Sequence, residues 1–267
     1  KEAILGQKTE SISLETDIPV RPPVLCPGCP HRGLYYALKK LNVYVSGDIG
    51  CYTLGALAPL SQVDTCVCMG ASVSSLHGFN KANDDKTAKK SVAVIGDSTF
   101  IHSGVTGLIN IAYNKGISTV IILDNSITGM TGHQQNPTTG KTIKGDPTVA
   151  VNLEALAKAV GIESVRVIDP NDLENSKKVI AEELEKDEPS LVISRRPCAL
   201  LKYVKHFPPL KVNEDKCKGC KACMAIGCPS ISIKNRKAHI DETLCVGCDV
   251  CSQLCKFDAI EKQGGTN

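Results

Sequence analysis

The chain alternates between two hydrophobic patterns over most of its length. Short runs of β-branched and apolar residues, typical of buried strands, occur at 43–46, 65–69, 92–96, 119–124 and 191–194. Between them, apolar residues recur with the period of a helix, at about 32–41, 104–115, 152–160 and 172–186. Strands that alternate with helices predict an α/β fold, with a mostly parallel sheet and helices on both faces.

Three local details of this pattern lead to further predictions. The helix at 104–115 follows the segment STFIHSG, which we expect to be a loop. The helix at 172–186 follows DPND, where Asp169 or Asn171 is the candidate N-cap. Cys66 and Cys68 alternate along one apolar run, so we expect them to share a face as small buried residues.

The same pattern divides the chain into three parts. Residues 1–23 are polar and indicate an N-terminal arm or linker, and residues 24–206 hold the strands and helices. The prolines of HFPPLKV, at 206–212, indicate a linker. Residues 207–267 then form a small Cys- and Lys-rich domain, in which one cysteine pattern repeats 28 positions apart, from Cys217 to Cys245.

Composition narrows the class of protein. Apolar residues make up 42% and charged residues 22%, as in globular proteins, and a net charge of +3 gives no nucleic-acid footprint. No apolar run approaches the roughly 18 residues of a membrane span, and no secretory signal opens the sequence. The 14 cysteines fall largely in C-x-x-C sets, which favour metal ligation in a reducing cytoplasm over disulfides.

Eight cysteines of the small domain form two sets of similar spacing. The sets resemble the bacterial-type two-cluster ferredoxin, in which the fourth cysteine of each run ligates the other [4Fe–4S] cluster. The resemblance implies that cluster one is held by Cys217, Cys220, Cys223 and Cys255. It implies that cluster two is held by Cys245, Cys248, Cys251 and Cys228.

This sequence departs from the ferredoxin pattern in two places. The first run has one extra residue before Cys228, and Lys256 stands where a proline is usual. Either change could alter a loop without removing a ligand. A pair of zinc sites is the alternative, because C-x-x-C pairs also bind zinc. Such a small domain has little apolar core, so bound clusters would largely hold it together.

Polar residues also follow two neighbouring predicted strands of the large domain. Gly96, Asp97 and Ser98 follow one strand, and Asn125 ends the next. A G-D-x segment with an Asn about 28 residues later resembles the thiamine diphosphate motif. The resemblance implies that Mg²⁺ is bound by the Asp97 carboxylate, the Asn125 side chain and the Ile127 carbonyl, all of them oxygen ligands. Gly96 would let the chain approach the diphosphate. A plain turn is the alternative, since Asp and Asn are common at strand ends.

The segment TGMTGHQQNPTTG follows Asn125 and indicates a long functional loop, because it is rich in Gly, Thr and Asn. It is similar to an M-T-G-x-Q stretch of 2-oxoacid:ferredoxin oxidoreductases that lies beside the diphosphate. This likeness implies that Thr131 and Gln134 lie near the cofactor. His133 would lie there too or face solvent.

Four further cysteines resemble a third cluster site of the same oxidoreductases. CPGCPHR contains Cys26 and Cys29, GDIGCYTLG contains Cys51, and RRPCAL contains Cys198. In that family a C-x-G-C pair, the Cys of an I-G-C turn and a late Cys hold a cluster close to thiamine. The resemblance implies a third [4Fe–4S] cluster on these four residues. Free structural thiols are the alternative, since C-x-x-C alone is a weak signal.

Taken together, these motifs resemble the C-terminal part of the large (alpha) subunit in the indolepyruvate ferredoxin oxidoreductase family, within the 2-oxoacid:ferredoxin oxidoreductases. The resemblance implies oxidative decarboxylation of aryl pyruvates to acyl-CoA, with electrons passed through iron–sulfur clusters to an external ferredoxin. Two alternatives stay open. One is the same chemistry on pyruvate or a branched-chain 2-oxo acid. The other is a ferredoxin-fused electron-transfer protein without thiamine catalysis.

The resemblance also implies partners. In the family a pyrimidine-binding domain supplies an activating Glu, and a second (beta) subunit completes a hetero-oligomer. Because the match begins at the diphosphate half and the chain begins at Lys1, we expect the pyrimidine half to come from elsewhere. The chain alone would then show no turnover, whether it is a fragment or a natural split subunit.

Overall fold

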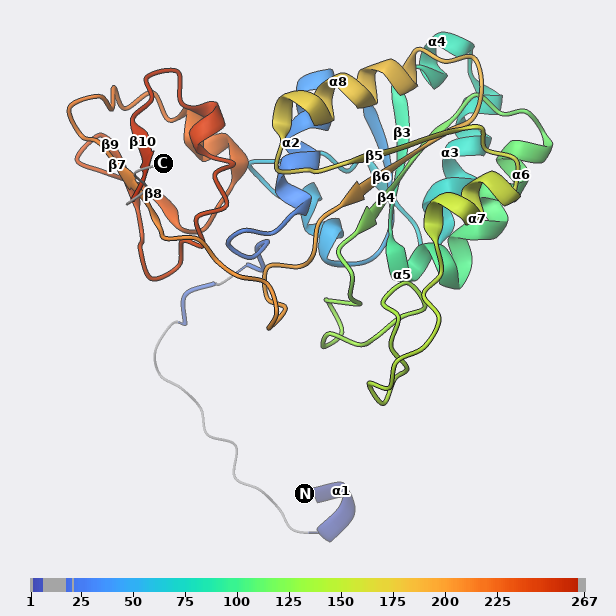
Figure 1. Cartoon of the computed structure of the whole chain (residues 1–267), viewed down its shortest axis with the longest axis horizontal. Helices are drawn as coiled ribbons and strands as arrows, with labels where there is room; N and C mark the ends of the chain where they lie inside the picture. Colours follow the sequence, from blue (N-terminus) through green and yellow to red (C-terminus); the bar gives the residue numbers. More distant parts are fainter. Residues whose placement is uncertain (1, 7–17, 21, 264–267) are drawn as a thin grey trace.

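The computed structural model describes residues 2–6, 18–20 and 22–263 (Figure 1). Most of the expected arm over 1–23 lies outside the described residues, although helix α1 (Glu2–Leu5) belongs to the described part. The arm therefore stays a prediction.

A six-stranded sheet forms the centre of the large domain, in the order β2-β1-β3-β4-β6-β5. All of its strand pairs are parallel, which confirms the predicted α/β fold. The strands are β1 (Tyr44–Gly47), β2 (Thr65–Cys66), β3 (Ser91–Gly96), β4 (Thr119–Asp124), β5 (Ser164–Ile168) and β6 (Ser190–Arg195). The inner strands β3 and β4 are buried along their whole length, as their continuous apolar runs predict.

The two edge strands differ from the predicted ones. The prediction of a strand over 65–69 is wrong beyond Cys66, because β2 has two residues and both are exposed at the sheet edge. Cys66 and Cys68 are exposed, so their predicted burial is also wrong. The opposite edge strand, β5, was not predicted, because its sequence SVRVI carries an arginine and is only partly buried.

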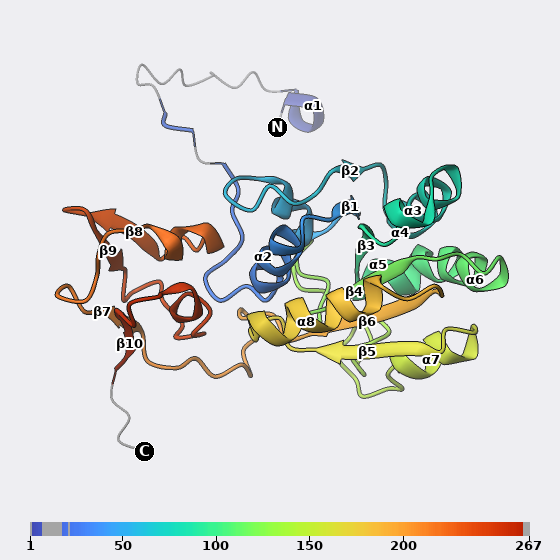
Figure 2. The same cartoon turned by 90° about the horizontal axis from the view of Figure 1, so that it is seen from above.

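Helices cover both faces of the sheet, as Figure 2 shows from above. Helices α2 (His31–Leu41) and α8 (Leu173–Leu184) pack with Val92, Val94 and Ile121 on one face. Helices α3 (Ala71–Ala82), α6 (Val105–Tyr113) and α7 (Leu153–Ala159) pack with Ala93 and Ile95 on the other. Alternate residues of one strand thus enter opposite cores, which is the geometry of a sheet covered on both sides.

Two helix boundaries correct the sequence analysis. The segment expected to be a loop at 98–104 is helical, since α5 (Asp97–Thr99) starts directly after β3 and a π-helical turn over Phe100–Gly104 leads into α6. The N-cap of α8 is Asp172, whose side chain accepts from the Asn175 amide, and neither predicted candidate caps this helix. Asp169 instead closes the preceding turn by accepting from the amide of Asn171 at 2.9 Å.

Helix α3 was missed, and α4 (Asp85–Ala88) is a single short turn beside it. The buried face of α3 contains polar side chains, so its sequence lacks a clear apolar stripe. Asn80 is buried because its side chain donates to the Ile117 carbonyl at 3.0 Å and accepts from the Ser91 hydroxyl at 2.8 Å. Tertiary hydrogen bonds thus replace the apolar contacts by which a helix is usually recognised.

The small domain is built on two short antiparallel pairs and its cysteine loops. Strand β7 (Leu210–Val212) pairs with β10 (Ile260–Lys262), and β8 (Ile231–Lys234) pairs with β9 (Lys237–Ile240). The predicted linker over 206–212 is therefore wrong at its end, where β7 already belongs to the small domain. The two domains touch, since Gln253 accepts from the Leu173 amide at 3.1 Å and donates to the Asn171 carbonyl at 2.7 Å.

A close helix contact gives a test of this packing. In α2, a Cβ added to Gly33 would lie 1.7 Å from the Pro170 carbonyl oxygen, just before α8. We expect Gly33→Ala to lower the free energy of unfolding by roughly 3 kcal/mol, because the helix must move away from rigid backbone. Urea unfolding followed by circular dichroism measures this loss.

The matched control is Gly78→Ala in α3, where an added Cβ meets nothing within 4 Å. This variant should gain about 0.5–1 kcal/mol, the usual difference between Ala and Gly in a helix. Equal stability of the two variants would contradict the contact between α2 and Pro170.

Candidate active site

Asp97 lies where the central strand β3 turns directly into a helix. Its side chain is buried, and its carboxylate accepts from the Asn136 side-chain amide at 3.2 Å and from the Thr138 hydroxyl at 3.1 Å. Burial, with a smaller contribution from the charge of Asp124, raises the pKa of Asp97 to about 6. No lysine or arginine pairs with it among the described residues. A buried carboxylate of this kind is suited to a cation.

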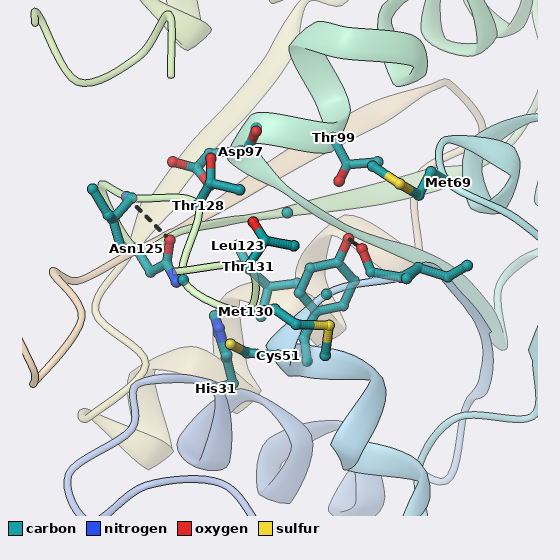
Figure 3. A pocket seen from close by; sticks show the side chains of 17 residues that line it. His31, Cys51, Met69, Asp97, Thr99, Leu123, Asn125, Thr128, Met130 and Thr131 are labelled. Carbon is teal, nitrogen blue, oxygen red and sulfur yellow. Dashed lines mark hydrogen bonds between the residues drawn. The ribbon is translucent and has the colours of Figure 1, made fainter. Parts of the chain in front are cut away.

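Asn125 lies beside Asp97, at the end of the neighbouring strand β4 (Figure 3). Its side-chain oxygen accepts from the Ile127 amide at 3.3 Å, which holds the first turn of the chain after the strand. Its carbonyl accepts from the Cys198 amide at 2.9 Å. The structure thus brings together Asp97, Asn125 and Ile127, which all line one cleft.

The predicted loop after Asn125 contains no helix or longer strand among its described residues, up to α7. An isolated antiparallel bridge joins Thr128 to Gln134 and folds the intervening residues back. Thr131 lines the cleft, whereas Gln134 reaches it only through Thr131. The Thr131 hydroxyl donates to the Gln134 side-chain oxygen, and the Gln134 side-chain amide donates to the Thr131 backbone carbonyl, both at 2.6 Å. His133 points elsewhere, since its Nε2 lies 3.9 Å from the Cys198 Sγ.

Sequence reasoning missed the two side chains of this loop that bind Asp97. Asn136 and Thr138 stand in NPTTG, and their type and place show only that the segment is polar. The Asn136 side-chain oxygen accepts from the Thr138 amide at 2.9 Å, so the two form one turn. The contact to Asp97 depends on a long loop returning to the sheet, for which the sequence carries no local signal.

The opposite wall of the cleft is organised by Asp48, which is fully buried at the end of β1. Its carboxylate accepts from the amides of Ile49 at 2.8 Å, Gly70 at 2.9 Å and Ser72 at 3.1 Å. One side chain thus fixes the loop that carries Cys51 and the start of α3. The sequence did not identify Asp48 as a site residue, although Asp48 belongs to the GDIGC stretch that resembles the third-cluster site of the oxidoreductases.

The cleft between these walls has an empty space of about 550 Å³. Gly96 and Ser98 line it together with Tyr52, and a Cβ on Gly96 would lie 2.6 Å from the Tyr52 ring. Gly96 is therefore needed for the close approach of this ring. Carboxylate, amide and hydroxyl groups around an otherwise apolar cleft fit a phosphorylated ligand held through a divalent cation.

Four cysteines from distant parts of the large domain line a second cavity, of about 980 Å³. They are the predicted third set, Cys26, Cys29, Cys51 and Cys198. The lining is mostly apolar, and burial raises the pKa of Cys29 to about 12. Cys51 lines both this cavity and the cleft of Asp97, so the two spaces share a wall.

The cysteines of the small domain separate into the two predicted crossed sets. One cavity of about 360 Å³ is lined by Cys217, Cys220, Cys223 and Cys255. Another, of about 410 Å³, is lined by Cys228, Cys245, Cys248 and Cys251. Backbone amides point at the sulfurs, as Ala238 does to Cys217 at 3.4 Å and Ala259 to Cys255 at 3.3 Å. Amide donors to sulfur stabilise thiolates, and the Ala238 amide lowers the pKa of Cys217.

Two features are absent from the described residues. No group of three or more His, Cys, Asp or Glu side chains there is placed to hold a single metal ion. No helix in this part of the chain has the length and apolar character needed to cross a membrane.

Comparison with known proteins shows extensive similarity to one curated group. The chain is 43% identical over 268 residues to the indolepyruvate oxidoreductase subunit IorA of Pyrococcus abyssi, covering 92% of this chain and 41% of that protein. It is 43% identical over 282 residues to the IorA subunit of Thermococcus kodakarensis, covering 97% and 43%. The chain thus spans about two fifths of the length of these relatives.

A solved structure has the same fold at low sequence identity. The 2-oxoglutarate:ferredoxin oxidoreductase of Magnetococcus marinus superposes with a TM-score of 0.56 and 19% identity, over 69% of this chain and 67% of that one. A 4Fe–4S binding domain model matches residues 238–261. The model of the thiamine pyrophosphate enzyme C-terminal TPP-binding domain matches residues 48–194, more than half of the chain. The chain therefore belongs to the thiamine pyrophosphate enzymes, and its large domain is their C-terminal TPP-binding domain.

Proposed function

We propose that the protein takes part in the oxidative decarboxylation of aryl pyruvates, of the indolepyruvate type, to acyl-CoA, with electrons leaving through iron–sulfur clusters to ferredoxin. The similarity to indolepyruvate oxidoreductase subunits supports this substrate class. One observation supports a direct link between decarboxylation and electron transfer: Cys51 lies on the wall shared by the Asp97 cleft and a four-cysteine cavity. Electrons released in the cleft would therefore have an acceptor site next to it.

The residues of the cleft have distinct roles in this proposal. Asp97, Asn125 and the Ile127 carbonyl would bind Mg²⁺, and the ion would hold the diphosphate. Asn136 and Thr138 orient the Asp97 carboxylate through their hydrogen bonds. Ser98 and Thr131 supply hydroxyls along the cleft, and Gln134 holds Thr131. When bound, thiamine diphosphate supplies a carbon nucleophile that attacks the 2-oxo group.

The three cysteine sets form a chain of neighbouring sites. Cys29 lines the cavity of its own set and also that of cluster two. Cys251 of cluster two lies close enough to Cys223 of cluster one for their charges to interact. We assign one [4Fe–4S] cluster to each of these three sites. From the Asp97 cleft outward, the order is the third cluster, cluster two and cluster one. Cys220 of cluster one is exposed and suited to an external ferredoxin.

We assign residues 24–206 to the diphosphate-binding domain and 207–267 to the ferredoxin domain. A pyrimidine-binding half and a second subunit would complete the enzyme, because the chain spans about two fifths of its relatives. We assign the protein to the cytoplasm, where a reducing environment keeps its cysteines available as cluster ligands.

The substrate is tested in the complete anaerobic assembly. We expect viologen reduction that requires coenzyme A and has its highest kcat/KM with indolepyruvate, compared with pyruvate and branched-chain 2-oxo acids. A higher kcat/KM with one of the other acids would assign the alternative substrate. A protein that holds clusters but no thiamine diphosphate, and reduces no dye, would instead be an electron-transfer protein.

Removing the Asp97 carboxylate tests the magnesium site. Asp97→Ala should weaken thiamine diphosphate binding by on the order of a hundredfold or more, since Mg²⁺ loses its charged protein ligand. Calorimetric titration in the presence of Mg²⁺ measures the affinity. Iron content should stay unchanged, because Asp97 lines none of the cysteine cavities. The control Asp146→Ala removes an exposed carboxylate of the same loop region and should bind normally.

Iron analysis tests the number of clusters. Three cubane clusters require about twelve irons per chain, and two require about eight. We expect about twelve after full reconstitution, and a loss of up to about four in Cys198→Ala. A plateau at about eight irons, with no change in Cys198→Ala, would refute the third cluster and leave the ferredoxin domain assignment intact.

A further inference from the structure

Arg32 is a buried cation at the junction of the two domains. It lies in α2 with 4% of its surface exposed. Within the described residues it makes no salt bridge, and each hydrogen bond of its side chain goes to a backbone carbonyl. A guanidinium stays charged in proteins, so its burial calls for negative charge close by.

The carbonyls that Arg32 contacts belong to two separate cysteine loops. Two lie where the first C-x-x-C segment begins: Nη2 donates to the carbonyl of Leu25, just before the segment, and Nε donates to that of Cys26 at 3.3 Å. Nη1 donates to the carbonyls of Ile226, at 3.2 Å, and of Gly227, just before Cys228. The planar fork of one side chain thus joins the third-cluster loop to the cluster-two loop.

Direct packing keeps these loops together beside Arg32. A Cβ on Gly28, between Cys26 and Cys29, would lie 2.3 Å from a methyl carbon of Val246, between Cys245 and Cys248. Gly28, Cys29 and Arg32 line the same cavity as the four cysteines of cluster two.

The charges that face Arg32 come from the same two cysteine sets. Burial lowers the pKa of Arg32, and the thiolates of Cys228, Cys29, Cys26 and Cys248 act in the opposite direction. Cys26 and Cys29 belong to the third cluster, and Cys228 and Cys248 belong to cluster two. With clusters bound, these cysteines would be thiolate ligands, and the negative charge that offsets the buried guanidinium would come from both sets.

We propose that Arg32 is a positioning residue for electron transfer, which fixes the third-cluster site against cluster two and favours the reduced state of cluster two. The inference rests on the cluster assignments of the proposed function. Reduction adds one electron to a cluster, and hence one negative charge. A fixed cation in a buried site stabilises the more negative state and so raises the reduction potential. Arg32 would thereby draw electrons from the thiamine side towards the ferredoxin domain.

The test is a redox titration of the full protein, reconstituted anaerobically and reduced by dithionite with no 2-oxo acid present. Paramagnetic resonance reports the reduced fraction of each cluster at fixed potentials. In Arg32→Gln we expect at least a tenfold fall in the reduced-to-oxidised ratio of cluster two at a fixed potential, equivalent to about 59 mV for a one-electron couple. The titration step of cluster one should stay in place, because Arg32 does not line its cavity.

Arg196→Gln is the matched control. Arg196 is also close enough to act on the charge of Cys248, but it is half-buried and already pairs with Asp169 at 2.6 Å. Arg196→Gln should change the reduced-to-oxidised ratio of cluster two by less than twofold. An equal effect of both variants, or a wild-type ratio in Arg32→Gln, would overturn the proposal.

Arg32→Lys tests the charge of Arg32 separately from its hydrogen-bond geometry. It also tests the proposal if Arg32→Gln fails to assemble its clusters. Lysine keeps the charge but not the fork, so the reduced-to-oxidised ratio should stay within about threefold of wild type, while the magnetic interaction between the third cluster and cluster two changes. A wild-type interaction in this variant would refute the positioning role. Iron content of the wild type reports independently on the third cluster, and the dithionite titration does not depend on the substrate.

Discussion

The site depends on the parallel direction of the six strands. Because β1, β3, β4 and β6 run the same way, their carboxyl ends meet at one edge, where the chain leaves each strand for a loop or helix. Asp48, Asp97 and Asn125 are the first residues after three of these strands. Cys198 follows the fourth and is tied to Asn125 through its amide. One sheet edge therefore gathers groups from four segments.

Charge is divided unevenly along this edge. The Nε of Arg195 donates to Asp124 at 2.7 Å, and its terminal nitrogens donate to Glu154 at 2.7 and 2.9 Å. Asp97 has only the neutral donors Asn136 and Thr138, besides backbone. The arginine thus satisfies two carboxylates next to the cleft and leaves the third for a ligand. A second arginine near Asp97 would compete with any cation that binds there.

Sequence patterns predicted those parts of the molecule whose information is local. The central strands have continuous apolar runs, and the cysteine spacings separate into the same sets that line the cavities. Helix α3 was missed because its buried face includes His77 and Asn80, and the burial of Cys66 was wrong because an edge position cannot be read from composition. Asn136 and Arg32 act through contacts with residues far along the chain, which no periodicity or spacing reveals.

The contact of Gly28 with Val246 also restricts how such a protein can evolve. Gly28, between the paired cysteines of one loop, lies against Val246, between the paired cysteines of the other, so position 28 has no room for a side chain while Val246 is in place. A C-terminal domain joined to this large domain must therefore match this surface as well as supply cysteines. Exchange of the module for an unrelated ferredoxin would fail at this contact unless position 28 stayed glycine and the incoming loop carried a side chain of similar shape. The contact thus makes the sequence of one domain depend on that of the other.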